Sequence, residues 1–226
     1  MIGGRRLRNA AGRLAMSVGR TARTSPLSRE FGFDRGSPID RHYIESFLGD
    51  HSGDIRGRVL EIGDDGYSKR FGGARVTRQD VLHLRIGTPG ATIAGDLANP
   101  ATLPAQAFDC IILTQTLHLI FDMAAAISTV HSALRPGGVL LVTVPGITPV
   151  DGGEWKSSWY WSLTEAAIAG LLSGPFQAEA VSARTYGNLF AATAFLHGAA
   201  VEEVPARKLA PVDPAYPVTV AARAVV

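Results

Sequence analysis

The sequence contains little of what marks disulfide-rich, membrane-spanning or metal-binding proteins. Cys110 is its single cysteine among 226 residues, so no internal disulfide can form and we expect a reducing, cytoplasmic location. The longest apolar run, Val139 to Val144, has the length of a strand and predicts no transmembrane segment. The six histidines show no metal-ligand spacing, which predicts no metal site.

Two common catalytic motifs are also missing. The sequence has no Gly-x-x-x-x-Gly-Lys phosphate loop and no Gly-x-Ser-x-Gly nucleophile elbow. Lysine is nearly absent, the formal net charge is only +2, and no basic stripe interleaved with aromatic residues runs through the chain after residue 29. Phosphate-loop ATPases and hydrolases of the nucleophile-elbow type are therefore disfavoured, and nucleic acid is the least favoured partner.

Basic charge gathers at the N-terminus, where residues 1–29 contain seven arginines and no acidic residue. We expect a basic, poorly ordered arm. The alternative is an arm that binds an anionic surface (lipid, nucleic acid or a phosphorylated substrate), and an organelle transit peptide would have a similar composition. The chain is 46% hydrophobic and 19% charged, so we expect residues 30–226 to form a single globular α/β domain.

Strand-length apolar runs alternate with helical segments after residue 36. We expect helices over residues 37–50, 122–134, 162–172 and 188–197. We expect strands over residues 58–62, 74–77, 91–94, 108–113, 139–144, 178–185 and 218–225. The motif Ser162-Leu-Thr-Glu165 predicts a capping box at the start of the third helix. This alternation is typical of a mostly parallel sheet with helices on both faces.

Polar residues follow four of these strands at the point where each ends. They are Glu61-Ile62-Gly63 after the first strand, Asp80 after the second, Gly95-Asp96-Leu97 after the third and Thr114-Gln115-Thr116 after the fourth. Ligands of an open parallel sheet bind beyond the carboxyl ends of its strands. Asp80 lies about twenty residues after the first motif, the spacing at which nucleotide-binding folds place a ribose-binding acid.

This set of motifs resembles the class I S-adenosylmethionine-dependent methyltransferases, from about Gly57 to Gly146. The motifs that carry the resemblance are Leu60-Glu-Ile-Gly63, Asp80, Gly95-Asp96, Phe108-Asp109 and Leu134-Arg-Pro-Gly-Gly138. The resemblance implies a Rossmann-like, seven-stranded, mostly parallel sheet with helices on both faces and an antiparallel last strand. It implies S-adenosylmethionine as the cofactor, with Gly63 facing its methionine part, Asp80 its ribose and Asp96 its adenine. The candidate cofactor-binding residues are Glu61, Ile62, Gly63, Asp64, Asp65, Asp80, Val81, Gly95, Asp96, Leu97, Thr114, Gln115 and Thr116.

The loop after the first strand departs from the family pattern Gly-x-Gly-x-Gly. It reads Gly63-Asp-Asp-Gly-Tyr67, so Asp65 and Tyr67 stand where glycines are usual. The two acids suit the cationic sulfonium and ammonium groups of S-adenosylmethionine. They would repel the pyrophosphate of a dinucleotide, which argues against an NAD-dependent enzyme. The altered loop also leaves open a non-catalytic, methyltransferase-like partner protein.

Candidate catalytic and substrate-binding residues surround the predicted cofactor site. His118 follows the fourth strand and is the first candidate for a general base, with His42 as the second; the alternative for His118 is a packed, hydrogen-bonded side chain. The candidate substrate-binding residues are Arg35, Tyr43, Trp155 and Trp159. The two tryptophans belong to a cluster with Tyr160 and Trp161 that can stack on a flat substrate or form a hydrophobic lid.

The sequence therefore predicts a methyltransferase that acts on a saccharide or small natural product. O-methylation is favoured, and N-methylation is the alternative. Arg35–Tyr43, Glu61–Asp65 and Tyr186–Asn188 resemble a bacterial subgroup often found beside glycosyltransferases, which supports a saccharide acceptor. An oligomer is compatible with the sequence.

Overall fold

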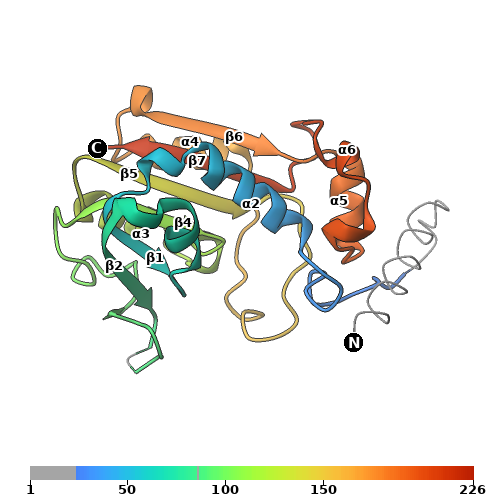
Figure 1. The fold of residues 1–226 in the computed structure, drawn as a ribbon, viewed down its shortest axis with the longest axis horizontal. Helices are drawn as coiled ribbons and strands as arrows, with labels where there is room; N and C mark the ends of the chain where they lie inside the picture. Colours follow the sequence, from blue (N-terminus) through green and yellow to red (C-terminus); the bar gives the residue numbers. More distant parts are fainter. Residues whose placement is uncertain (1–23, 86) are drawn as a thin grey trace.

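A computed structural model of the chain describes residues 24–85 and 87–226. Seven strands form one sheet in the order β3-β2-β1-β4-β5-β7-β6 (Figure 1). Their bounds are Gly57–Ile62 (β1), Val76–His83 (β2), Ile93–Ala94 (β3), Phe108–Thr114 (β4), Leu134–Pro145 (β5), Val181–Tyr186 (β6) and Thr219–Val225 (β7). Strands β1 to β5 pair in parallel, whereas β7 runs antiparallel to both β5 and β6. The predicted fold class and the antiparallel last strand are confirmed.

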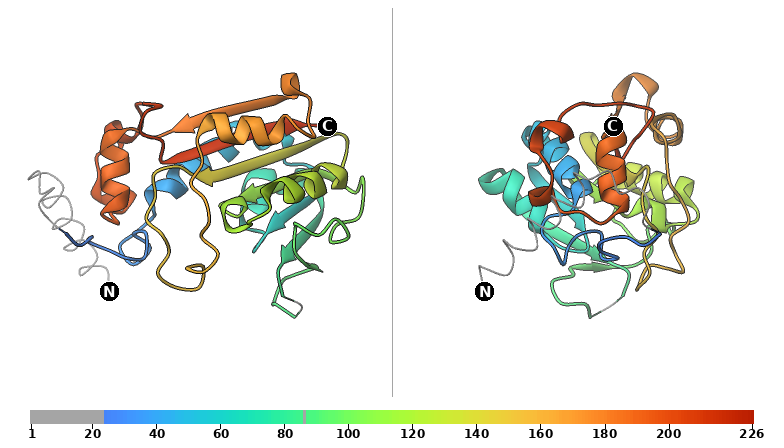
Figure 2. Two further views of the ribbon diagram at one scale, coloured as in Figure 1. Left: turned by 180° about the vertical axis from the view of Figure 1, so that it is seen from behind. Right: turned by 90° about the vertical axis from the view of Figure 1, so that its right-hand side faces the viewer.

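Helices cover both faces of the sheet. Their bounds are Ile39–Asp50 (α2), Met123–Ala133 (α3), Glu165–Leu172 (α4), Leu189–Leu196 (α5) and Ala206–Leu209 (α6). Helix α2 lies in front of the sheet in Figure 1, and the reverse view in Figure 2 brings α3 and α4 to the front. Because β4 is covered on both faces, its side chains divide between two buried apolar clusters: Ile111 joins the α3 and α4 side, and Ile112 the α2 and α5 side.

The second strand begins later and ends later than predicted. Residues 73–75 form a short 3-10 turn, so β2 starts at Val76 and continues to His83. The residues after Thr77, where the strand was expected to end, belong to the strand, because other groups bind their polar side chains. Asp80 pairs with Arg58, and Gln79 donates to the carbonyl of Asp65. The prediction that Asp80 follows the second strand is therefore wrong: Asp80 lies within β2.

The predicted capping box at the start of α4 is wrong. The helix begins at Glu165, and its N-cap is Thr164, whose Oγ1 accepts a hydrogen bond from the backbone N–H of Ala167 (3.2 Å). The Glu165 carboxylate does not return to the cap, because it accepts a hydrogen bond from Thr185 Oγ1 on β6 (2.8 Å). The Glu165 carboxylate thus contacts β6 and does not make the local capping-box hydrogen bond that was predicted.

The chain before α2 packs against the C-terminal end of α5. The backbone N–H of Leu27 donates to the carbonyl of His197 (2.7 Å), and Gly32 adopts a φ of +95° close to the carbonyl of Ala199. Most of the predicted basic arm, up to residue 23, lies outside the described residues. Within the ranges that are described, none of the helices is long and apolar enough to cross a membrane.

Candidate functional site

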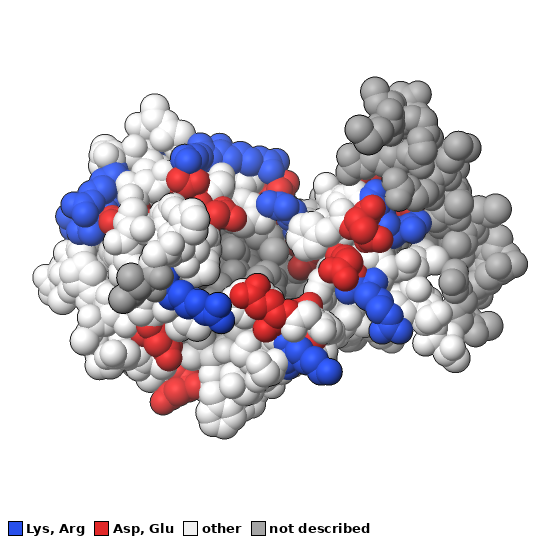
Figure 3. Space-filling model, turned by 90° about the horizontal axis from the view of Figure 1, so that it is seen from below, with Lys and Arg blue, Asp and Glu red and all other residues white. Residues whose placement is uncertain are grey.

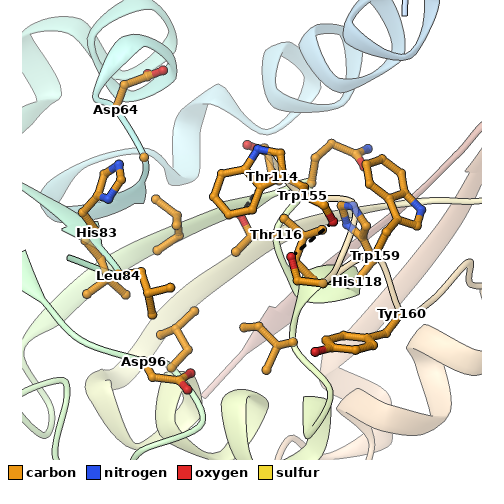
Figure 4. A pocket seen from close by; sticks show the side chains of 18 of the residues that line it. Asp64, His83, Leu84, Asp96, Thr114, Thr116, His118, Trp155, Trp159 and Tyr160 are labelled. Carbon is orange, nitrogen blue, oxygen red and sulfur yellow. Dashed lines mark hydrogen bonds between the residues drawn. The ribbon is translucent and has the colours of Figure 1, made fainter. Parts of the chain in front are cut away.

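A cavity of about 860 Å³ opens at the carboxyl ends of β1 to β4. Side chains that follow each of these strands line it, as expected for a ligand site of an open parallel sheet. Figure 4 shows two different walls: Asp64, His83 and Asp96 lie on one side, and Trp159 and Tyr160 lie on the other. Residues between Thr114 and Ile120 separate the two walls.

Glycine shapes the wall at the end of β1. Gly63 has a φ of +89°, a conformation that favours glycine, and no heavy atom lies within 4 Å of the place where a Cβ would stand. Its neighbour Asp64 accepts a hydrogen bond from the backbone N–H of Gly66 (2.8 Å), which fixes the turn. The backbone at Gly63 therefore faces open space in the cavity, and a ligand can approach it closely.

The departure from the glycine-rich pattern does not disturb this loop. Within it, Gly63 has a positive φ, whereas the backbone at Tyr67 is right-handed helical (φ −74°, ψ −42°). The single glycine that the loop conformation requires is thus present. The ring of Tyr67 joins the cavity wall, and the guanidinium of Arg41 lies 5.8 Å from its centroid.

Glu61 lies beneath the cavity and does not line it. Its side chain is 2% exposed and accepts hydrogen bonds from Ser68 Oγ (2.7 Å) and from the backbone N–H groups of Ser68 (2.8 Å) and Tyr67 (3.1 Å). Burial raises the pKa of the carboxyl group, and these hydrogen bonds partly oppose the shift. Glu61 therefore holds the loop that carries Gly63, rather than a ligand. Asp65 also lies outside the lining and pairs with Lys69 (2.6 Å).

Asp80 and Val81 do not reach the cavity either. Asp80 lies on β2, next to the edge strand β3, in register with Leu60 of β1, and Arg58 Nε lies 2.7 Å from its carboxylate. Hydrogen bonding and the charge of Arg58 outweigh burial and lower the pKa of Asp80. The side chains that stand at the carboxyl end of β2 are His83 and Leu84. Sequence reasoning missed both, although the apolar run after Asp80 was a signal for a longer strand.

The third strand end matches its predicted position. Gly95, Asp96 and Leu97 all line the cavity, and Asp96 Oδ1 accepts a hydrogen bond from the backbone N–H of Ala98 (2.9 Å). Ile62, Gly63 and Asp64 from β1 line the cavity as well, as do Thr114, Gln115 and Thr116 from β4. The structure thus brings together most of the residues expected to bind the cofactor.

His118 is buried between the two walls. It belongs to the short turn after β4, is 1% exposed, and burial lowers the pKa of its imidazole to about 4. Neither ring nitrogen has a hydrogen-bond partner among the described residues. The alternative for His118 was a packed, hydrogen-bonded side chain. The ring is packed, edge-on against Trp159 with ring centroids 4.5 Å apart, but its nitrogens are not hydrogen-bonded.

Aromatic side chains form the opposite wall. Trp159 stacks on Phe31 with ring centroids 5.7 Å apart and planes 12° apart, and Trp155 (40% exposed) and Tyr160 (47% exposed) are more exposed than Trp159. Phe31 comes from the segment before α2, which the sequence analysis did not include in the site. A possible signal was the spacing of Phe31 and Phe33, two aromatic residues separated by a glycine.

Three other predicted site residues have structural contacts elsewhere. Arg35 is not in the lining: its Nε donates to Glu203 (3.0 Å), whose carboxylate is 1% exposed. Tyr43 packs in the core and donates its hydroxyl to the carbonyl of Leu209 (3.0 Å). His42 is exposed on the outer side of α2 and contacts the Tyr43 ring. The two preceding helical residues, Asp40 and Arg41, line the cavity instead.

The chain was compared with known families and solved structures. A family model described as a methyltransferase domain matches residues 42–192. No curated protein matches the sequence. Among solved structures, an S-adenosylmethionine-dependent methyltransferase from Archaeoglobus fulgidus is similar, with 11% identity, a TM-score of 0.54, and coverage of 82% of this chain and 94% of that chain.

Two further structures come from rhizobial bacteria. A methyltransferase from Mesorhizobium loti shares 15% identity with a TM-score of 0.53, covering 83% of this chain and 98% of that chain. The N-methyltransferase NodS from Bradyrhizobium japonicum shares 16% identity with a TM-score of 0.52, covering 84% and 88%. At such identities the likeness shows the fold alone. The family match, which spans most of the chain, shows more: the chain belongs to the methyltransferase domain family, as a class I S-adenosylmethionine-dependent methyltransferase.

Proposed function

We propose that the cavity binds S-adenosylmethionine along the ends of β1, β2 and β3 and presents its methyl group to an acceptor under the aromatic wall. Support comes from the open space at Gly63, which a Cβ would otherwise enter, and from the acids Asp64 and Asp96 on the same side. An ammonium or sulfonium group is favoured near carboxylates. A cavity of about 860 Å³ is large enough for two small molecules.

In this arrangement the methionine part lies at Ile62, Gly63 and Asp64, and the adenine lies at Asp96 and Leu97. The ribose lies between them, where β2 ends. His83 and Leu84 line the cavity at that point, so we assign the ribose contacts to them in place of Asp80 and Val81. Thr114, Gln115 and Thr116 lie beside the methyl group, where the two walls meet.

The bound cofactor supplies a methyl group activated by its positive sulfonium. The protein's part is to exclude water and to hold the acceptor in line with the carbon–sulfur bond. A neutral imidazole accepts a proton, and His118 stays neutral at physiological pH because burial lowers its pKa to about 4. We propose that a ring nitrogen of His118 would accept the hydroxyl proton of the acceptor when its oxygen takes the methyl group, the carbon–sulfur bond breaking to leave S-adenosylhomocysteine.

The acceptor we propose is a hydroxyl group of a saccharide or small natural product. The observation that carries O-methylation is the buried, unsatisfied imidazole of His118 at the junction of the two walls. Trp159 and Tyr160 offer flat apolar faces to a ring-shaped acceptor. The resemblance of Arg35–Tyr43 and Tyr186–Asn188 to a subgroup found beside glycosyltransferases supports a saccharide.

Titration calorimetry with S-adenosylmethionine and S-adenosylhomocysteine tests the cofactor assignment. We expect both to bind and Asp96→Ala to weaken binding by about tenfold, as for one lost charge-assisted hydrogen bond. Asp213→Ala is the matched control, because Asp213 Oδ1 also accepts from the backbone N–H two residues on (3.0 Å) and is not part of the lining. Absence of binding by the wild-type protein would overturn the proposed function.

A further inference from the structure

Three side chains at the inner end of the aromatic wall carry buried polar atoms without partners. Gln115 Nε2, both ring nitrogens of His118 and Trp159 Nε1 have no hydrogen-bond partner among residues 24–85 and 87–226. Buried polar atoms are nearly always satisfied in native proteins, because each unsatisfied one costs free energy. Since all three residues line one cavity, a ligand in that cavity is the natural partner.

Neighbouring contacts hold the Trp159 ring and the Gln115 backbone in place. The Trp159 ring is held between Phe31, on which it stacks, and the edge of His118 at 4.5 Å. Gln115 has a φ of +43°, an unusual conformation for a non-glycine residue, and its backbone N–H donates to the carbonyl of Thr143 (2.9 Å). Strain of this kind is concentrated at binding sites. We call these three side chains, which line the same cavity and carry unsatisfied polar atoms, the polar triad.

The charges of the lining select against an anionic acceptor. Among the described lining residues, Arg41 is the single lysine or arginine, and it lies 3.4 Å from Glu45 and over the Tyr67 ring. Acids are more numerous: they are Asp40, Asp64, Asp96 and Asp122. A carboxylate or phosphate on the acceptor would lose its hydration without gaining a free cationic partner.

The opening of the cavity is apolar. Phe121 is 68% exposed and Phe33 is 58% exposed, and both line the cavity. Trp155 and Tyr160 are also exposed there, and Tyr160 packs edge-on against Phe121 at 5.3 Å. Exposed apolar side chains that line one cavity indicate that an apolar part of the acceptor covers them when it is bound. Figure 3 shows the charges of the lower face, with red and blue side chains interspersed rather than gathered into a basic patch.

We propose that the acceptor is an uncharged molecule with two neighbouring oxygens and an apolar body, recognised by the polar triad of Gln115, His118 and Trp159. The hydroxyl to be methylated donates to His118. The neighbouring oxygen accepts from Gln115 Nε2 and Trp159 Nε1, and the apolar body lies against Phe33 and Phe121 at the opening. This inference rests on the proposed function, since the triad recognises the acceptor of that same reaction.

Titration calorimetry with the full chain saturated with S-adenosylhomocysteine tests this assignment. The probes are methyl 3,4-dihydroxybenzoate, phenyl β-D-glucoside and 3,4-dihydroxybenzoate. The first two are neutral, with neighbouring hydroxyls on an aromatic or sugar ring, and the third differs from the first by one carboxylate. We expect at least one neutral probe to bind, and the ester to bind at least tenfold more tightly than the carboxylate. The two neutral probes distinguish a phenolic acceptor from a saccharide.

Two tryptophan variants separate recognition from folding. Trp159→Phe keeps the ring that stacks on Phe31 and removes the N–H, so we expect a fivefold to tenfold loss of probe binding with unchanged binding of S-adenosylhomocysteine. Trp161→Phe is the control, because Trp161 Nε1 donates to the carbonyl of Ile120 (3.2 Å) outside the triad; we expect it to bind the probes like the wild type.

The outcomes are distinguishable. If S-adenosylhomocysteine does not bind, the proposed function itself fails. The acceptor assignment alone fails if S-adenosylhomocysteine binds while neither neutral probe does. It also fails if the carboxylate binds as tightly as the ester, or if Trp159→Phe binds the probes like the wild type.

Discussion

Two buried polar side chains near the strand ends, Glu61 and His118, differ in what satisfies them. Glu61 has three hydrogen-bond donors from the loop that follows it, whereas the nitrogens of His118 have none among the described residues. A satisfied buried group stabilises a local conformation, and an unsatisfied one has a cost that a ligand can remove. We therefore assign a structural role to Glu61 and a functional role to His118.

Substitution of Glu61 should destabilise the fold. Glu61→Ala leaves the backbone N–H groups of Tyr67 and Ser68 without their acceptor, so we expect the free energy of unfolding to fall by about 2–3 kcal/mol. Glu61→Gln keeps one acceptor oxygen, so we expect its free energy of unfolding to fall by less. Urea unfolding followed by circular dichroism measures both, with Glu179→Ala at an exposed carboxylate as the control. Equal stability of Glu61→Ala and the control would contradict the structural role.

His118 should make stability depend on pH. Its pKa is about 4 in the folded protein against a reference value of 6.5, so unfolding takes up a proton between these values. The stabilisation is complete above about pH 6.5 and is lost as the pH falls toward 4, by about 3 kcal/mol in total. Urea unfolding measures the free energy of unfolding at pH 7.5 and at pH 4.5. We expect this free energy to fall by about 2 kcal/mol less in His118→Asn than in the wild type. Parallel pH dependences would show that the imidazole titrates normally.

At the scale of elements, the segment before α2 carries Phe31 into the cavity wall, and the Arg35–Glu203 pair anchors that segment. Glu203 is buried and also accepts from the backbone N–H of Ala200 (3.0 Å). Arg35→Met leaves this carboxylate without its charged partner, so we expect a loss of about 3–5 kcal/mol. Arg35→Met with Glu203→Gln should recover part of it.

The control for this prediction is an exposed ion pair. Arg184 lies 3.6 Å from Asp50, with both side chains more than half exposed, so Arg184→Met should change stability by about 0.5 kcal/mol or less. Thermal or urea unfolding compares the variants. If Arg35→Met costs no more than Arg184→Met, the ion pair does not anchor the segment before α2, and its other contacts hold it.

At the scale of the whole molecule, the single cysteine reports on unfolding of the sheet. Cys110 lies on the central strand β4, is fully buried, and burial raises the pKa of its thiol. We expect a thiol reagent to label it at a rate set by global unfolding. S-adenosylhomocysteine at about 100 times its Kd should slow labelling by about 100-fold, equivalent to about 2.7 kcal/mol. Labelling faster than unfolding measured by circular dichroism would mean that β4 opens locally.

Much of the fold was predictable because its signals are local. Apolar runs such as Phe108 to Leu113 form buried strands, and the glycine after β1 turns the chain at the cavity. The predictions failed where a distant partner changed the meaning of a polar residue. Asp80 was expected after a strand ending at Thr77, at the spacing of a ribose-binding acid, but Arg58 on the neighbouring strand lets it stay inside the sheet. Arg35 looked like a ligand contact, and Glu203 pairs with it instead.

By itself, the sequence determined the family, the order of strands and helices along the chain, and the residues after β1, β3 and β4 that meet at the cavity. These features follow from hydrophobic periodicity and from short motifs, and both depend only on residues that are close together in the sequence. The tertiary structure alone decided which side chains face the cavity: Phe31 and His83 join the site, whereas Glu61, Asp80 and Tyr43 do not. The physical reason is that a polar or aromatic side chain settles where its hydrogen bonds and packing are satisfied, and residues far away in the sequence supply those partners.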